Sequence, residues 1–161
     1  GEGDFWHRSW INSVDHFSKE TSNCFKISQD RGLGLIIHGT RLWKNYKVEA
    51  DLVLHLGKFA GLTARTQGLR RYYAARLCHN QLFQIIRVFD DNYKILSEVN
   101  FSFELDKKIS VSLSVNDKKI FAMAGEKTLS VIDDSDESLS SGGIGLFVFE
   151  GTLSTELIRI N

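Results

Sequence analysis

Apolar and polar residues alternate along most of this chain, which is the pattern of β-strands buried on one face. Residues 46–54 alternate strictly at first and then become apolar, as expected where a strand is covered on both faces. Residues 108–115 carry Ile, Val or Leu at every odd position from Ile109 to Val115, against lysine and serine between them. The same pattern predicts strands over 61–67, 72–78, 82–89, 93–103, 120–124, 128–132, 144–149 and 153–160.

Short turn signals separate these segments. Proline is absent, so the turns depend on Gly, Asn and Asp, which tolerate positive φ. Nearer the N-terminus, 24–28 and 33–38 predict two strands joined by a turn at 30–32. Roughly ten to twelve strands at this spacing indicate an antiparallel sandwich or barrel. Further turns are expected at 79–80, 90–92, 116–117 and 125.

The whole chain, 1–161, is expected to form one domain. Residues 1–24 are less regular and rich in aromatic residues, and we expect them to pack on the sandwich. Phenylalanine is frequent in the predicted strands, and a large apolar ring is a natural filler between two sheets. The rings expected in that core are Phe83, Phe89, Phe101, Phe103, Phe147 and Phe149.

Charge and composition exclude several function classes. The 20 Lys and Arg balance 20 Asp and Glu, so the basic excess of a nucleic-acid binder is missing. No apolar run approaches the roughly 20 residues of a membrane span. Two cysteines, Cys24 and Cys78, are too few for a disulfide scaffold, and buried free thiols are expected rather than a bridge. The opening Gly1-Glu2-Gly3-Asp4 is typical of an excised domain, so the sequence does not indicate a compartment.

Three consecutive runs carry a family resemblance. They are Y-K-V-E-A-D at 46–51, A-G-L-T-A-R-T-Q at 60–67 and Y-Y-A-A-R-L at 72–77. In this order they resemble the concanavalin A-like lectin/glucanase sandwiches of the laminin-G-like and carbohydrate-binding module family 66 type. The run G-G-I-G-L-F-V-F-E-G at 142–151, continuing to 160, resembles the closing hairpin of that superfamily. Residues 61–73 also resemble the sandwich module found C-terminal to ADP-ribosylglycohydrolase-like bacterial enzymes.

The resemblance covers about residues 25–161. It implies an all-β, antiparallel two-sheet jelly-roll of concanavalin A-like type. It also implies a non-catalytic accessory module that binds carbohydrate or a sugar-containing ligand, with a glycohydrolase-type catalytic domain in the same polypeptide. A shared fold does not fix the ligand, because the superfamily includes sugar binders, hydrolases and structural modules.

Strand pleating suggests a binding face, because residues two apart on a strand share one side. Sugar recognition uses planar polar groups that pair with vicinal hydroxyls and a ring that covers the apolar face of the sugar. If neighbouring registers agree, one face carries such a set, with Trp43 as the best-placed platform. The alternative is a solvated ion-pair network, since opposite charges across strands also stabilise a sheet. The candidate ligand-binding residues are Trp43, Glu49, Asp51, Arg65, Gln67, Tyr72, Arg76 and Gln84.

Two other functions compete with sugar binding. A structural or interaction module would pack on a catalytic domain or mediate dimerisation. A small glycoside hydrolase would use Glu49 and Asp51 as its carboxyl pair. Catalysis is not expected, because nearby arginines would lower both pKa values whereas a general acid needs a raised one. The chain also lacks the E-x-D-x-x-E strand of catalytic laminarinase-like members.

No cofactor is predicted from the sequence. No CxxC or HxxxH spacing marks a zinc site. The acidic stretch 133–137 offers oxygens for Ca²⁺, but its spacing does not match an EF-hand loop, and a solvated loop is the favoured interpretation. Related sandwiches often hold a structural Ca²⁺ through loop oxygens, so that option stays open with no ligands assigned.

Overall fold

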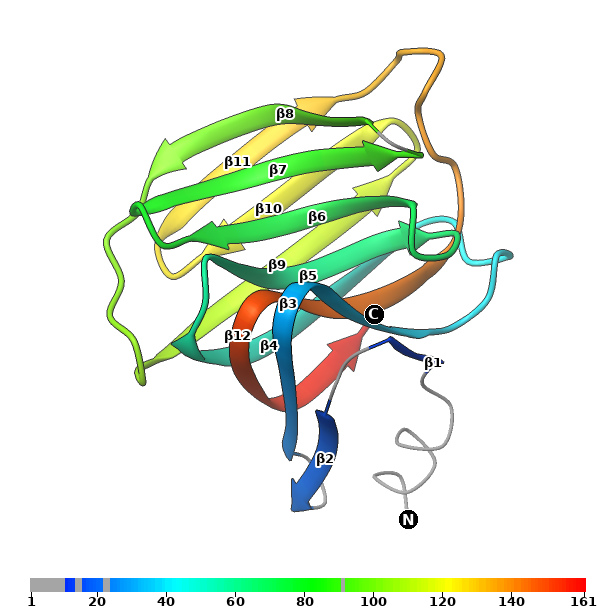
Figure 1. The fold of residues 1–161 in the computed structure, drawn as a ribbon. Helices are drawn as coiled ribbons and strands as arrows, with labels where there is room; N and C mark the ends of the chain where they lie inside the picture. Colours follow the sequence, from blue (N-terminus) through cyan, green and yellow to red (C-terminus); the bar gives the residue numbers. More distant parts are fainter. Residues whose placement is uncertain (1–10, 14–15, 22–23, 91) are drawn as a thin grey trace.

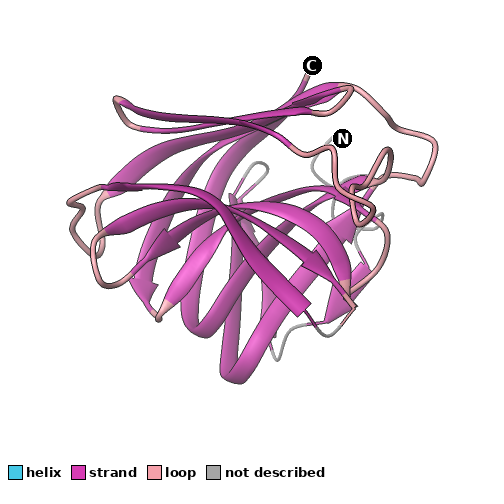
Figure 2. Ribbon diagram, turned by 90° about the horizontal axis from the view of Figure 1, so that it is seen from above, coloured by secondary structure: helices cyan, strands magenta, loops and turns pink. Residues whose placement is uncertain are grey.

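The computed structural model describes residues 11–13, 16–21, 24–90 and 92–161. In these residues the regular structure is strand, with no helix (Figures 1 and 2). None of them forms a helix long and apolar enough to cross a membrane. The strands are β1 (Ile11–Ser13), β2 (His16–Thr21), β3 (Cys24–His38), β4 (Tyr46–Leu56), β5 (Phe59–Thr66), β6 (Arg71–Cys78), β7 (Leu82–Phe89), β8 (Asn92–Asn100), β9 (Lys108–Asn116), β10 (Lys119–Ala124), β11 (Lys127–Ile132) and β12 (Gly143–Ile160).

The strands form two layers that share β3 and β12. Residues 152–160 of β12 pair with β4, which continues through β9 and β10 to β11; we call this layer sheet I. Residues 143–149 of β12 pair with β5, which continues through β6 and β7 to β8; this layer is sheet II. Figure 1 shows sheet II lying over sheet I. Every pairing is antiparallel, so the predicted two-sheet sandwich is confirmed.

The two terminal hairpins expected from the sequence are wrong, because β3 and β12 are each continuous. The expected turn at 30–32 is instead a bulge opposite Glu150, between the pairs Phe149–Leu33 and Gly151–Gln29. Gly32 and Glu150 take φ values of +69° and +52°, and the Gly32 amide lies 3.3 Å from the Glu150 carboxylate. The turn residues therefore bend a strand pair from one sheet into the other instead of reversing the chain.

The core lies between the sheets and follows the predicted alternation. On β4 the inward residues are Val48, Ala50, Leu52 and Leu54, all buried. On β6 the inward residues are Tyr73, Ala75 and Leu77, which alternate with outward-facing neighbours. The tight turns use Asp as expected, since Asp90, Asp106 and Asp117 have φ between 52° and 63°. The free thiol of Cys78 is buried, as predicted.

The phenylalanine prediction is only partly correct. Phe83 is in the core, and Phe89, Phe101 and Phe103 pack against it. Phe147 instead belongs to a second apolar cluster on the outer face of sheet II, and Phe149 lines a groove on that face. The reason is that β12 changes sheets, so its pleat in 143–149 directs these rings away from the interior. The aromatic run at 5–10 lies outside the described residues.

Candidate functional site

The structure does not place the predicted site residues on one face. Glu49 and Asp51 alternate with the buried residues of β4, so they point outward from sheet I. Tyr72 and Arg76 alternate with the core residues of β6, and Gln84 pairs directly with Arg76, so these three point outward from sheet II. The two groups lie on opposite outer faces of the sandwich. The prediction of a single shared face is wrong, because β4 and β6 belong to different sheets.

Arg65 lies on neither face. It is 2% exposed and takes a φ of 48° at the end of β5. Its guanidinium donates to the carbonyl oxygens of Lys44, Asp117 and Leu139, at 3.0, 2.5 and 2.9 Å. It also donates to the side-chain oxygen of Asn45, at 3.1 Å. A residue with left-handed φ interrupts the regular alternation of side chains, so the Arg65 side chain points inward. There it hydrogen-bonds to three loops, around residues 44–45, 117 and 139.

Gln67 and Trp43 also make contacts that hold loops in place. The Gln67 side-chain amide donates to the Ser141 carbonyl at 2.9 Å. Trp43 packs edge-on against His38 and Tyr46, with ring centroids 5.8 and 5.9 Å apart, and contacts the core. Neither contributes to the grooves described below, so the structure offers no support for Trp43 as a sugar platform.

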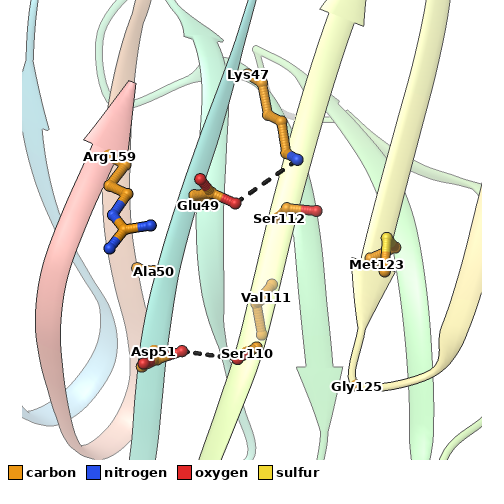
Figure 3. A pocket seen from close by; sticks show the side chains of 10 residues that line it. All are labelled: Lys47, Glu49, Ala50, Asp51, Ser110, Val111, Ser112, Met123, Gly125 and Arg159. Carbon is orange, nitrogen blue, oxygen red and sulfur yellow. Dashed lines mark hydrogen bonds and ion pairs between the residues drawn. The ribbon is translucent and has the colours of Figure 1, made fainter. Parts of the chain in front are cut away.

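A polar groove of about 250 Å³ crosses the outer face of sheet I between β4, β9 and β12. Three of its charged groups, Lys47, Glu49 and Asp51, have partners within the groove (Figure 3). Lys47 Nζ lies 3.6 Å from Glu49, and Ser110 donates to Asp51 at 2.7 Å. Arg159 of β12 lies on the other side of Glu49. Two cations and two carboxylates leave this sheet I groove with no net charge, which fits the ion-pair alternative raised by the sequence.

A second groove, of about 330 Å³, lies on the outer face of sheet II. Its centre is Arg76, which is partly exposed. The guanidinium carbon lies 4.1 Å from the ring centroid of Phe59 and 5.5 Å from that of Tyr93. Stacking on two rings holds the guanidinium plane in place. The lining residues of this sheet II groove are Leu33, Phe59, Tyr72, Arg76, Ile86, Val88, Asp90, Asn92, Tyr93, Phe147 and Phe149.

A hydrogen-bonded series runs from Arg76 across three strands. Arg76 donates through Nε and Nη2 to Gln84 Oε1, at 2.9 and 2.6 Å. Gln84 then donates to Glu98 at 2.9 Å. A guanidinium has five N–H donors. Two of them are used here, so the group keeps donors for a ligand while its orientation is fixed.

The rim of the sheet II groove is polar and exposed. Asp90 accepts two hydrogen bonds from Arg71, at 2.9 and 3.0 Å. These hydrogen bonds hold the pKa of Asp90 below its ordinary value. Tyr93 is 63% exposed at the edge of the groove, and Asn92 precedes it. At the floor, burial raises the pKa of Tyr72 to about 12, so its hydroxyl stays protonated.

Sequence reasoning found Tyr72, Arg76 and Gln84 but missed the aromatic and polar residues around them. Phe59 is the first residue of β5, Asn92 and Tyr93 are the first two residues of β8, and Asp90 lies in the turn before β8. The alternating pattern signalled strands there, but it carried no information on how the ends of neighbouring strands align. The turn signal at 90–92 marked this rim without indicating what lies beside it.

The acidic stretch 133–137 is only in part the solvated loop expected from the sequence, since Asp134, Ser135 and Asp136 are exposed but Asp133 is buried. Asp133 is 4% exposed and lies 2.7 Å from Arg87, whose side chain is also buried. Burial alone would raise the pKa of Asp133, but hydrogen bonds from Tyr73, Arg87 and Ser135 outweigh it and lower the pKa. Glu137 also contacts Arg87, at 3.2 Å. Within the described ranges, no group of three or more His, Cys, Asp or Glu side chains is arranged to hold a metal ion.

Comparisons with known proteins define the fold. No family model matches the sequence, and no curated protein matches it significantly. Carbohydrate-binding module CBM66 from Bacillus subtilis superposes with a TM-score of 0.83 at 13% identity, covering 95% of each chain. A Bacillus subtilis protein of unknown function with a galectin-like fold gives 0.71 at 10% identity, covering 96% of this chain and 89% of that one. Chicken galectin 2 gives 0.58 at 10% identity, covering 76% and 95%.

These similarities confirm the concanavalin A-like jelly-roll that the sequence motifs suggested. At 10–13% identity they show the fold alone. The narrower resemblance to modules of ADP-ribosylglycohydrolase-like proteins stays a prediction.

Proposed function

We propose that this chain is a non-catalytic carbohydrate-binding module whose ligand lies in the sheet II groove. The observation that carries the proposal is the Arg76 guanidinium, held between Phe59 and Tyr93 with part of its donor set unused. Its planar N–H groups match the spacing of vicinal sugar hydroxyls. The exposed ring of Tyr93 suits the apolar face of a pyranose or furanose ring.

The similarity of the fold to CBM66, which is named a carbohydrate-binding module, supports the same proposal. We place Glu49, Asp51, Arg65, Gln67 and Trp43 outside this binding site. The compensated charges around Glu49 and Asp51 also favour binding over a glycosidase mechanism. Such an open groove removes little ligand surface from water, so modest affinity is expected.

Affinity electrophoresis on a panel of neutral and uronic-acid polysaccharides tests the proposal. At least one polysaccharide should retard the wild-type protein. Arg76→Ala should weaken that binding about ten-fold or more, because a hydrogen bond to a charged group is worth about 1.5–3 kcal/mol. Arg159→Ala is the matched control, since Arg159 is an exposed arginine on the other sheet. Equal retardation of wild type and Arg76→Ala, with both proteins folded, would contradict the proposed site.

The finer proposal is that the module belongs to a glycohydrolase-type enzyme and holds it on its substrate. In that polypeptide, Arg76→Ala should reduce hydrolysis of an insoluble polysaccharide while leaving hydrolysis of a small soluble glycoside unchanged. Equal loss on both substrates would contradict a targeting role.

One observation favours the structural-module alternative. The sheet II groove is lined mainly by apolar side chains, including Leu33, Phe147 and Phe149. A protein surface could occupy such a groove. Under this alternative, no polysaccharide retards the wild-type protein, and Leu33→Asp weakens association with a second copy or an attached domain in analytical ultracentrifugation.

A further inference from the structure

Three side chains from distant parts of the chain form a hydrogen-bonded series on the outer face of sheet I. His55 of β4 is in the middle. Its Nδ1 lies 2.6 Å from Asp106 Oδ1, and its Nε2 lies 2.5 Å from Ser154 Oγ. Asp106 comes from the loop between β8 and β9, and Ser154 comes from β12, 99 residues after His55. This site is separate from the sheet II groove of the proposed function.

The order of atoms matches that of an activated hydroxyl nucleophile. A carboxylate at Nδ1 keeps the ring proton on that nitrogen, so Nε2 presents its lone pair to the serine hydroxyl. Ser154 then donates its hydroxyl hydrogen to Nε2, and the imidazole can accept that proton as Oγ attacks. We propose that Ser154 is a nucleophile activated by His55 and Asp106, which accepts an acyl group from an activated carboxylic ester.

The surrounding backbone fixes this arrangement. Ser154 pairs with Val53 of β4, so its side chain points outward on the same face as His55. Asp106 is anchored by its own amide, which donates to the Leu54 carbonyl at 3.0 Å. The Asp106 residue also takes a φ of 63°. The His55 side chain is 36% exposed, so a small ester can reach the pair from solvent.

The position of Ser154 also limits the chemistry. It lies in the interior of sheet I, where β12 pairs with β3 on one side and β4 on the other. Its backbone N–H therefore belongs to the sheet ladder and does not provide an oxyanion hole. We expect slow, stoichiometric acylation instead of rapid turnover. With p-nitrophenyl acetate, the Oγ–acyl bond forms, the bond to p-nitrophenolate breaks, and the serine proton passes to Nε2 and then to water. No group is oxidised or reduced.

The experiment treats the full chain with p-nitrophenyl acetate and maps acetylation by peptide mass spectrometry. Ser110 is an internal control, because it lies on the same sheet and donates to Asp51 at 2.7 Å without a histidine on its hydroxyl. Ser154 should be acetylated at least about ten-fold faster than Ser110, since a positioned general base contributes roughly 10²–10⁴-fold in closed sites. His55→Gln should remove this difference. Asp106→Asn should slow the acetylation of Ser154 and keep the left-handed backbone, which asparagine tolerates.

The proposal is overturned if Ser154 and Ser110 react at equal rates in the wild-type protein. It is also overturned if His55→Gln leaves the rate at Ser154 unchanged while its melting temperature matches that of the wild type. Failure of Arg76→Ala to affect sugar binding would leave this result untouched, because the two sites lie on opposite sheets.

Discussion

Replacing Arg65 by alanine tests whether the buried guanidinium is a structural fastener or a ligand-binding group. The change removes four hydrogen bonds, to Lys44, Asn45, Asp117 and Leu139. The bond to Leu139 is fully buried, so its loss costs about 1.5–3 kcal/mol, while the others are partly buried and cost about 0.5–1.5 kcal/mol each. Because the costs of hydrogen bonds made by one side chain do not simply add, we expect the free energy of unfolding to fall by about 4 kcal/mol.

That loss corresponds to a fall in melting temperature of about 8–16 °C for a chain of this size. Differential scanning calorimetry measures it directly, with Arg159→Ala as the exposed-arginine control, expected within about 0.5 kcal/mol of the wild type. Below its own melting temperature the Arg65→Ala protein should still bind the polysaccharide that the wild type binds.

A second substitution checks the backbone part of this reasoning. Arg65 has a φ of 48°, a region that costs a residue with a Cβ about 1–2 kcal/mol and costs glycine almost nothing. Arg65→Gly should therefore melt higher than Arg65→Ala, which reverses the usual order of these residues in a strand. If the melting temperature of Arg65→Ala lies within about 2 °C of that of the wild type, the structural role of Arg65 is refuted. Loss of sugar binding with stability retained would instead return Arg65 to the binding site.

Two further predictions concern pH. The pKa of Asp133 is lower in the folded protein than its ordinary value, so its contribution to stability is present above about pH 4 and is lost as the pH falls through the folded pKa. Asp133→Asn should destabilise the protein by about 1.5–3 kcal/mol at pH 7, because buried Arg87 then keeps only the more exposed Glu137 as a charge partner. It should also flatten the decline in melting temperature between pH 5 and pH 2.5, and an unchanged acid decline would contradict this. Burial raises the pKa of Tyr46 to about 12, so its contribution is complete below about pH 10 and is lost as the pH rises toward 12. Tyr46→Phe should cost about 1–3 kcal/mol at pH 7, because the hydroxyl no longer donates to the Gly142 and Gly143 carbonyls or accepts from the Arg65 amide. It should also reduce alkaline unfolding measured by circular dichroism. An equal alkaline transition in both proteins would exclude Tyr46 as its source.

The alternating pattern was enough to predict most strands but left a sandwich or a barrel open, and the family resemblance favoured the two-layer architecture. It failed where a local signal had two meanings. Gly32, within an Asp-Arg-Gly sequence, indicates a hairpin turn, yet the same positive φ serves a bulge when a matching irregularity faces it at Glu150. Only the partner strand distinguishes the two, and that partner is more than a hundred residues away in the chain.

The candidate site shows a similar division. Arg76 and Gln84 were found because neighbouring antiparallel strands joined by a short turn have a register that the turn fixes. Glu49 and Arg65 were wrongly joined, because a loop between strands carries no mark of whether the chain stays in its sheet or crosses to the other one. Arg65 was also misplaced by its left-handed backbone, since side chains alternate regularly only where φ stays extended.

The continuity of β12 through both layers has a consequence for biosynthesis. A ribosome releases β12 last among the described strands, yet this strand stands between β4 and β3 in one sheet and between β5 and β3 in the other. Until residues 143–160 emerge, each sheet lacks its β12 strand, so backbone N–H and C=O groups of β3, β4 and β5 lack the β12 partners that they have in the folded domain. The two sheets of the nascent domain therefore cannot close before residues 143–160 are available.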